Sequence, residues 1–372
     1  MGIKLNRPVI IEILFLVFIR LALSSISTTS DEPPANFVFG DSLVDVGNNN
    51  YLVSLSKANF PPFGIDFGRP TGRFTNGRTI VDIIGEELAN GFSFTPPYLA
   101  PTSLGPVVLK GVNYASGGGG ILNFTGKIFG GRINFDAQLD NFANTRQDII
   151  SNIGVPAALN LFKRSIFSVT IGSNDFINNY LAPPVSIYEQ KFGSPELFVD
   201  TLISRFREQL TRLFNLGARK IIVTNVGPIG CIPSQRDTNL AVGDSCVAFP
   251  NQLAQLYNIK LKGLIAELSS NLKGSMFVYA DVYHILDDIL NNYTAYGFEN
   301  PYSSCCCLAG RFGGLIPCGP TSKVCWDRSK YVFWDPWHPT EASNVIIAKR
   351  LLDGDHNDIF PMNVRQLFNY LT

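Results

Sequence analysis

The 372-residue chain contains few charged residues and no excess of either sign. Lysine plus arginine and aspartate plus glutamate each number 30, and charged residues make up only 16% of the sequence. Because no net field would attract a polyanion, the composition argues against binding of nucleic acid or of an anionic membrane by charge. The 45% hydrophobic content predicts a folded globular protein with a substantial core.

The chain also lacks an uninterrupted apolar run that could cross a bilayer. The apolar stretch at 9–23 is broken by one glutamate and one arginine, which leave runs far shorter than the roughly 20 residues that a span needs. Basic residues precede this stretch and small residues follow it, which predicts a cleaved secretory signal peptide at about 1–28 and no stable membrane anchor. Two glycosylation triplets, beginning at Asn123 and Asn292, fit a secreted, extracellular protein.

All seven cysteines lie after residue 230, and none has the Cys-x-x-Cys spacing of a zinc site. In an oxidising compartment we expect six of them to pair, with Cys231 and Cys246 as natural local partners. The other partners would staple a loop and come from two groups: Cys306 and Cys307, and Cys318 and Cys325.

Short apolar runs alternate with longer amphipathic segments. Five runs are near-continuously hydrophobic, as expected for a parallel sheet covered on both faces: 37–39, 112–114, 166–171, 220–224 and 276–279. Helices are predicted over 79–89, from a cap at Ser194 to Gly217, and over 251–272. The alternation predicts one α/β domain at 29–372, a three-layer α/β/α sandwich with a central, mainly parallel five-stranded sheet.

Histidine is scarce, which narrows the search for a general base to His284, His338 and His356. His284 is expected near a strand–helix junction in a structural role, and His356 among neighbouring polar residues in solvent. His338 lies in a loop rich in tryptophan and proline, three residues after Asp335. One tight turn would let this carboxylate bind one ring nitrogen and leave the other free to take a proton.

A hydroxyl that could use such a base follows the first predicted strand. Ser42 lies on a tight turn that Gly40 permits, although most serines in this position are only turn or capping residues. We expect a helix that begins nearby to offer N–H groups to a developing negative charge, and Asp45 to complement the positive end of that helix.

A run of glycines at 117–120 follows the second predicted strand. No Gly-Lys-Ser or Gly-Lys-Thr comes after it, so it is not a phosphate-binding P-loop. The run could instead let backbone amides approach an oxyanion closely, with Asn174 as an amide donor from the next loop.

Four motifs occur in an order that resembles the blocks of the GDSL (SGNH) hydrolases: Gly40-Asp-Ser-Leu43, Gly117 in its glycine run, Gly172-Ser-Asn-Asp175 and Asp335-x-x-His338. The longer context, over about 36–352, resembles the secreted plant GDSL esterase/lipases. This resemblance implies a flavodoxin-like α/β/α fold and no metal or organic cofactor.

The resemblance also implies a role for each motif residue. Ser42 would be the nucleophile, His338 the general base and Asp335 its orienting partner. The Ser42 N–H, Gly117 and Asn174 would hold the oxyanion. Related chains read Ala-Cys-Cys-Gly where this one reads Cys-Cys-Cys-Leu at 305–308, so Cys305 looks like the odd thiol.

These features together predict a secreted serine esterase or lipase that cleaves small-molecule or lipid acyl esters through an acyl-enzyme. Acyl transfer on the same triad is the first alternative, because only water exclusion and acceptor geometry separate it from hydrolysis. A catalytically silent binding protein is the second, and the presence of all the expected site residues argues against it.

Overall fold

The computed structural model describes residues 34–88, 94–182, 193–239 and 241–370. The expected signal peptide at 1–28 lies outside them. From residue 34 onward the chain forms one compact unit. Among the described helices, none combines the length and the apolar character that crossing a bilayer requires.

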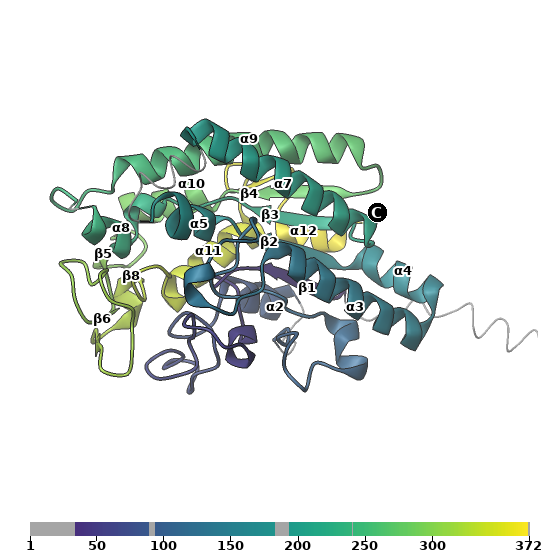
Figure 1. Cartoon of the computed structure of the whole chain (residues 1–372), viewed down its shortest axis with the longest axis horizontal. Helices are drawn as coiled ribbons and strands as arrows, with labels where there is room; N and C mark the ends of the chain where they lie inside the picture. The colour runs from purple at the N-terminus through teal and green to yellow at the C-terminus, as the bar shows by residue number, and fades with distance from the viewer. Residues whose placement is uncertain (1–33, 89–93, 183–192, 240, 371–372) are drawn as a thin grey trace, which may run out of the picture. The chain divides into compact units, whose positions relative to one another are not determined.

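A five-stranded sheet lies at the centre of this unit, in the order β1-β2-β3-β4-β9. Its strands are β1 (Asn36–Gly40), β2 (Ile166–Thr170), β3 (Lys220–Thr224), β4 (Met276–Ala280) and β9 (Ile359–Phe360). Strands β1 to β4 lie side by side in that order in Figure 1. The first four are parallel and in level register, and β9 pairs antiparallel to β4. The carboxyl ends of four strands therefore meet at one edge, where ligand sites of open α/β sheets lie.

The expected strand count is correct, but one member differs. The segment 112–114 is not a full strand, because Asn113 forms isolated bridges to Val38 and to Pro97. The segment runs along β1, with Tyr114 N–H donating to Val38 O at 2.7 Å. The fifth strand is β9, whose two residues are too few to give a periodic signal.

Alternate strand residues enter two separate cores, which makes the fold a three-layer sandwich. Phe277 and Tyr279 of β4 belong to one core, and Val278 and Ala280 to the other. Helices of the first core, which follow one another along the sheet in Figure 1, are α3 (Phe135–Ile153), α4 (Val155–Arg164), α7 (Pro195–Asn215) and α9 (Ala248–Asn271). Helices of the second are α2 (Ile80–Leu88), α10 (Val282–Asn291), α11 (Glu341–Asp353) and α12 (Val364–Asn369).

The three predicted helices are confirmed as α2, α7 and α9. In α7, the Ser194 side chain accepts the Leu197 N–H, and Pro195 occupies the first turn, where its missing N–H costs nothing. Gly217, with φ 118°, then reverses the chain toward β3.

The remaining helices and strands are short and lie between these larger elements. Those before β3 are η1 (Asn48–Tyr51), η2 (Gly105–Lys110), η3 (Lys127–Phe129), α5 (Ser173–Asp175) and the π-helix η4 (Phe176–Tyr180). Those after it are η5 (Ile229–Cys231), α8 (Pro233–Thr238), β5 (Asn300–Ser304), β6 (Cys306–Cys307), β7 (Lys323–Val324), η6 (Arg328–Lys330) and β8 (Tyr331–Phe333).

Three disulfides join Cys231 to Cys246, Cys305 to Cys325 and Cys306 to Cys318. The first is the expected local pair. The expectation that Cys305 is the odd thiol is wrong, because the free cysteine is Cys307. The register of β6 and β7 explains the difference: it sets Cys307 opposite Lys323 and so brings Cys305 beside Cys325, with the two Cα atoms 4.8 Å apart.

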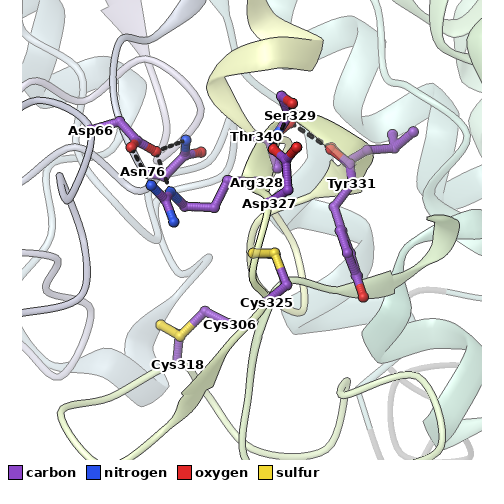
Figure 2. Close-up of a disulfide and its surroundings, with 12 residues drawn as sticks. Asp66, Asn76, Cys306, Cys318, Cys325, Asp327, Arg328, Ser329, Tyr331 and Thr340 are labelled. Carbon is purple, nitrogen blue, oxygen red and sulfur yellow. Dashed lines mark hydrogen bonds and ion pairs between the residues drawn. A yellow bond between two sulfur atoms is a disulfide. The ribbon is translucent and has the colours of Figure 1, made fainter. Parts of the chain in front are cut away.

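An early segment of the chain is tied to a late one through Asp66, Asn76, Arg328 and Glu341, which we call the seam. Arg328 donates to both carboxylate oxygens of Asp66 at 2.6 and 2.7 Å, and Asn76 Nδ2 donates to the same carboxylate at 2.7 Å (Figure 2). Asn76 Oδ1 accepts the Glu341 N–H at 2.9 Å, at the start of α11. The seam thus holds together residues more than 260 positions apart.

Candidate functional site

Ser42 lies on the turn that follows β1. The chain leaves the strand through Gly40, where a Cβ atom would lie 2.4 Å from Thr170 O, so no larger residue fits between the two strands. Asp41 N–H donates to Thr170 O at 3.1 Å, and Asp45 N–H donates back to Asp41 O at 3.0 Å. The expected helix is absent here: residues 42–44 form a turn, which presents the Ser42 side chain at the sheet edge.

His338 lies in the loop between β8 and α11, close to Asp335. The Asp335 Oδ1 atom accepts the backbone N–H groups of Trp337 and His338, each at 2.8 Å, and both carboxylate oxygens lie 2.8 Å from His338 Nδ1. The ring of Phe74 packs against the imidazole with a centroid separation of 5.3 Å. Thr75 donates to Pro339 O at 3.0 Å and so anchors the residue after the histidine.

The structure brings these distant segments into one hydrogen-bonded chain. His338 Nε2 lies 2.8 Å from Ser42 Oγ, although the two residues are 296 positions apart. Asp335 and His338 are 2% and 6% exposed, so water competes little for their contact. Such an arrangement can remove the serine proton while the carboxylate fixes the ring tautomer.

The two other histidines lie apart from this chain of hydrogen bonds. His284 is on α10 with a half-exposed side chain, and its Nε2 atom lies 3.9 Å from Asp358. His356 is exposed and packs edge-on against Phe360. Neither residue lines the cavity that contains Ser42.

The glycine run lies beside the serine turn, but Gly117 is oriented differently from what we expected. Its N–H donates to Asp45 Oδ2 at 3.0 Å, and it does not line the cavity. Asp45 lies at the start of the 3-10 helix η1, where its other oxygen accepts the N–H groups of Gly47 and Asn48 at 2.7 Å each. The neighbouring Gly118 does line the cavity, and no described residue accepts its N–H.

Asn174 reaches the same cavity from the end of β2. One of its Nδ2 hydrogens is donated to Gly119 O at 2.9 Å, which leaves the second available, and Asn178 donates to its Oδ1 atom at 2.7 Å. The adjacent Asp175 accepts the N–H groups of Ile121 and Leu122 at 2.9 and 3.0 Å. The Gly172–Asp175 block therefore supplies a donor and also fixes the end of the glycine run.

Three buried carboxyl groups surround the serine turn and the glycine run. Burial raises the pKa of Asp41 to about 7, and the pKa values of Asp45 and Asp175 to about 6 each. Backbone N–H groups limit the shift of the Asp41 pKa only in part, because its Oδ2 atom has no hydrogen-bond partner in the described structure. The site thus retains acidic groups whose charge costs free energy at neutral pH.

A cavity of about 230 Å³ opens beside Ser42 and His338. Thr170, Thr224 and Asn225, at the carboxyl ends of β2 and β3, provide polar lining. Apolar side chains form most of the remaining wall, among them Leu55, Phe60, Phe63, Phe74, Phe129, Ile177, Ile229, Val282 and Leu286. The hollow can receive an apolar ligand that presents one polar group to the serine.

One buried residue that supports the site gave no signal in the sequence. Gln138 of α3 accepts the Gly40 N–H at 2.9 Å and donates to Gly40 O at 2.7 Å, so it holds the strand end two residues before Ser42. Asn49 also supports the site, because its Nδ2 donates to Gly117 O at 2.8 Å. Its only signal in the sequence is the run of three asparagines at 48–50. Within the described ranges, no group of three or more His, Cys, Asp or Glu side chains could hold a metal ion.

Comparison with known proteins identifies the family of the chain. Residues 37–351 match the family model described as GDSL-like Lipase/Acylhydrolase. A GDSL esterase/lipase of Arabidopsis thaliana is 65% identical over 349 residues, which are 94% of this chain and 95% of the relative. A second Arabidopsis GDSL esterase/lipase is 52% identical over 90% of this chain and 87% of its own length, and GDSL esterase/lipase 7 is 44% identical over 90% and 92%. The chain therefore belongs to the GDSL lipase/acylhydrolase family.

Proposed function

We propose that this family member hydrolyses carboxylic esters, with Ser42 as the nucleophile, His338 as the general base and Asp335 as the group that orients the histidine. The observation that carries the proposal is the continuous contact from Asp335 through His338 to Ser42 Oγ. Membership of a family of esterases and lipases supports the same reaction class.

The proposed reaction has two halves. The Ser42 proton passes to His338 Nε2 as Oγ bonds to the ester carbonyl carbon, and the tetrahedral intermediate collapses when His338 returns that proton to the leaving alcohol. Water then attacks the acyl-enzyme, with His338 as the base, and releases the carboxylic acid and free Ser42. Every proton gained by the histidine is returned within the cycle, so no cofactor is needed.

The proposed oxyanion site consists of N–H groups around the serine turn. The Ser42 N–H and the second Nδ2 hydrogen of Asn174 have no acceptor among the described residues. From the glycine run, Gly118 suits the third position better than Gly117, whose N–H is already bound to Asp45. Fixed donors of this kind stabilise charge as it develops, without reorganisation at the moment of reaction.

We also propose that the protein is secreted and glycosylated. The predicted signal peptide, the three disulfides and the exposed Asn123 and Asn292 support this location. Expression in a eukaryotic secretory host should give extracellular protein whose N-terminus begins near residue 29. Its electrophoretic mobility should increase after glycosidase treatment.

The activity is tested with p-nitrophenyl esters from acetate to palmitate. Wild type should hydrolyse a range of these esters, whereas Ser42→Ala should retain its fold by circular dichroism and lose nearly all turnover. His338→Asn should behave in the same way, with His284→Asn and His356→Asn as active controls. Undiminished hydrolysis by Ser42→Ala would refute the assignment of the nucleophile.

A further inference from the structure

Large apolar side chains are exposed beside the cavity, on a short two-stranded ladder and on the 3-10 helix η3 that leads into it. We call Val53, Leu55, Ile128 and Phe129 the first lip. Val53, Leu55 and Ile128 are 95%, 83% and 62% exposed. The ladder is held by Leu55 N–H to Phe129 O and Gly131 N–H to Val53 O, each at 2.8 Å, around a bridge between Ser54 and Gly130. Single apolar side chains are common on protein surfaces, but several large ones gathered on one short segment form a patch typical of an interaction site.

The geometry of the ladder makes the first lip continuous with the cavity. Leu55 and Phe129 are direct cross-strand partners, so their side chains lie on one face, and Val53 shares that face because it is two residues from Leu55. Leu55 and Phe129 both line the cavity, and the Phe129 ring covers Gly118, where a Cβ atom would lie 2.7 Å from it. The exposed face therefore leads directly to the serine turn.

A second group of apolar side chains borders the same cavity. We call Leu315, Ile316 and Pro317 the second lip. Pro317 lines the cavity, and the two residues before it are 54% and 41% exposed. The adjacent Cys318 is fixed to Cys306 by a disulfide, so this lip is held in place covalently. The cavity is thus bordered by apolar surface from two segments far apart in sequence.

The charges carried by the lip segments themselves are all of one sign, although Asp244 pairs with Arg311 and Asp237 accepts the N–H groups of Phe312 and Gly314. The segments 51–57, 126–131 and 308–318 contain Lys57, Lys127 and Arg311, and no aspartate or glutamate. Nothing in these segments would repel phosphate or ester oxygens at a lipid surface, and lysine and arginine side chains can lie along an apolar boundary with their charge in water. The chain as a whole has a formal net charge of +0, so the attraction must come from apolar contact.

We propose that the two lips dock the enzyme on the surface of aggregated neutral lipid esters, so that substrate enters the cavity from that surface. This inference rests on the proposed function, because it gives the cavity an acyl ester to receive. A second copy of the chain is a poorer occupant, since a partner that covered both lips would also close the mouth through which an ester reaches Ser42. Burial of the lips would hold the enzyme at the interface in proportion to the apolar area removed from water.

The test uses a double variant in the first lip, Val53→Ser with Ile128→Ser, because neither residue lines the cavity. Its matched control is Val155→Ser with Ile259→Ser, which alters the same residue types at positions that are 53% and 72% exposed outside the lips. Each protein is assayed on dissolved p-nitrophenyl butyrate, and on tributyrin below and above its solubility limit. The wild-type rate should rise as tributyrin droplets form. The lip variant should lose about fivefold or more of the droplet rate and keep its rate on the dissolved ester, while the control keeps both.

Binding is measured separately from turnover. Ser42→Ala should float with phosphatidylcholine-coated triolein droplets, and the same protein with the two lip substitutions should not. If wild type did not hydrolyse the dissolved ester, the proposed function would be refuted. The flotation result would then still decide whether the lips bind a lipid surface. Equal droplet rates and equal flotation for the lip variant and the control would overturn the inference, as would a lip-dependent dimer in gel filtration.

Discussion

At the scale of single residues, a substitution at Asn174 should affect the chemical step more than substrate binding. Its free Nδ2 hydrogen is placed to meet charge that exists only in the transition state, so Asn174→Ala should lower kcat by about 10²–10³ with a smaller change in KM. Asn178→Ala is the matched control, because it alters the same cavity wall and removes the hydrogen bond to Asn174 Oδ1 but leaves the Asn174 donor in place. Steady-state kinetics on p-nitrophenyl butyrate measure both. Equal losses in the two variants would argue against a direct role for Asn174.

Asp41 should make stability depend on pH. Because burial raises its pKa from 3.8 to about 7, the folded state favours the protonated carboxyl. The stability that this preference adds is fully present below the ordinary aspartate pKa of 3.8 and is lost as the pH rises through about 7. Relative to Asp41→Asn, which cannot ionise, wild type should lose about 2–3 kcal/mol of unfolding free energy between pH 5 and pH 8.

Urea unfolding of both proteins at several pH values in that range measures this difference. Asp45 and Asp175 are present in both proteins, so their own titration largely cancels in the comparison. Parallel stability curves for wild type and Asp41→Asn would show that the folded protein does not protonate Asp41 preferentially.

At the scale of elements, the ladder of β6 and β7 decides which cysteines pair. Under denaturing, non-reducing conditions wild type should react with one equivalent of a thiol reagent, at Cys307. Cys307→Ser should give none. Cys305→Ser should give two, because it also frees Cys325. Two thiols in Cys307→Ser would contradict the pairing, because they would show that Cys307 had a disulfide partner and that another cysteine was free.

The elements that sequence predicts well are those with a long periodic signal. The α7 and α9 helices and the strands β2 to β4 were predicted within a few residues, since capping residues and continuous apolar runs mark them. β9 and the β6–β7 ladder were missed because two-residue strands carry no period, and pairing register depends on distant contacts. The helix expected after Ser42 failed for a related reason: the turn is stabilised by hydrogen bonds to Thr170 and within residues 41–45.

At the scale of the whole molecule, the seam joins the serine half of the site to the histidine half. Asn76→Ala should lower the free energy of unfolding by about 1–3 kcal/mol, because it leaves the Glu341 N–H unpaired in a partly buried position and removes the hydrogen bond to Asp66. Arg365→Ala, which breaks an exposed pair with Asp353, should cost about 1 kcal/mol or less. Urea unfolding at pH 7 compares them. Equal effects would mean that the seam adds nothing beyond a surface ion pair.

The candidate site was predictable to the extent that its residues lie in short motifs. The short motifs identify Ser42, Asp335 and His338, but only Ser42 follows a strand of the central sheet. Asp335 and His338 follow β8, which pairs with β5 in a separate sheet, so their approach to Ser42 depends on tertiary contacts. Which glycine amide faces the cavity was not predictable, since the orientation of Gly117 follows from its bond to Asp45 across 72 positions. Gln138 carries no local pattern and is recognised only from its two bonds to Gly40.

The wide separation of Ser42 and His338 in the sequence has a consequence during synthesis of the polypeptide. On the proposed assignment, a nascent chain carries its nucleophile from the first strand onward but gains its base 296 residues later. A ribosome-bound or prematurely terminated product that ends before Asp335 is therefore inert, however well its first strands have folded. Hydrolysis begins only when the last segments have been synthesised and have closed against the first.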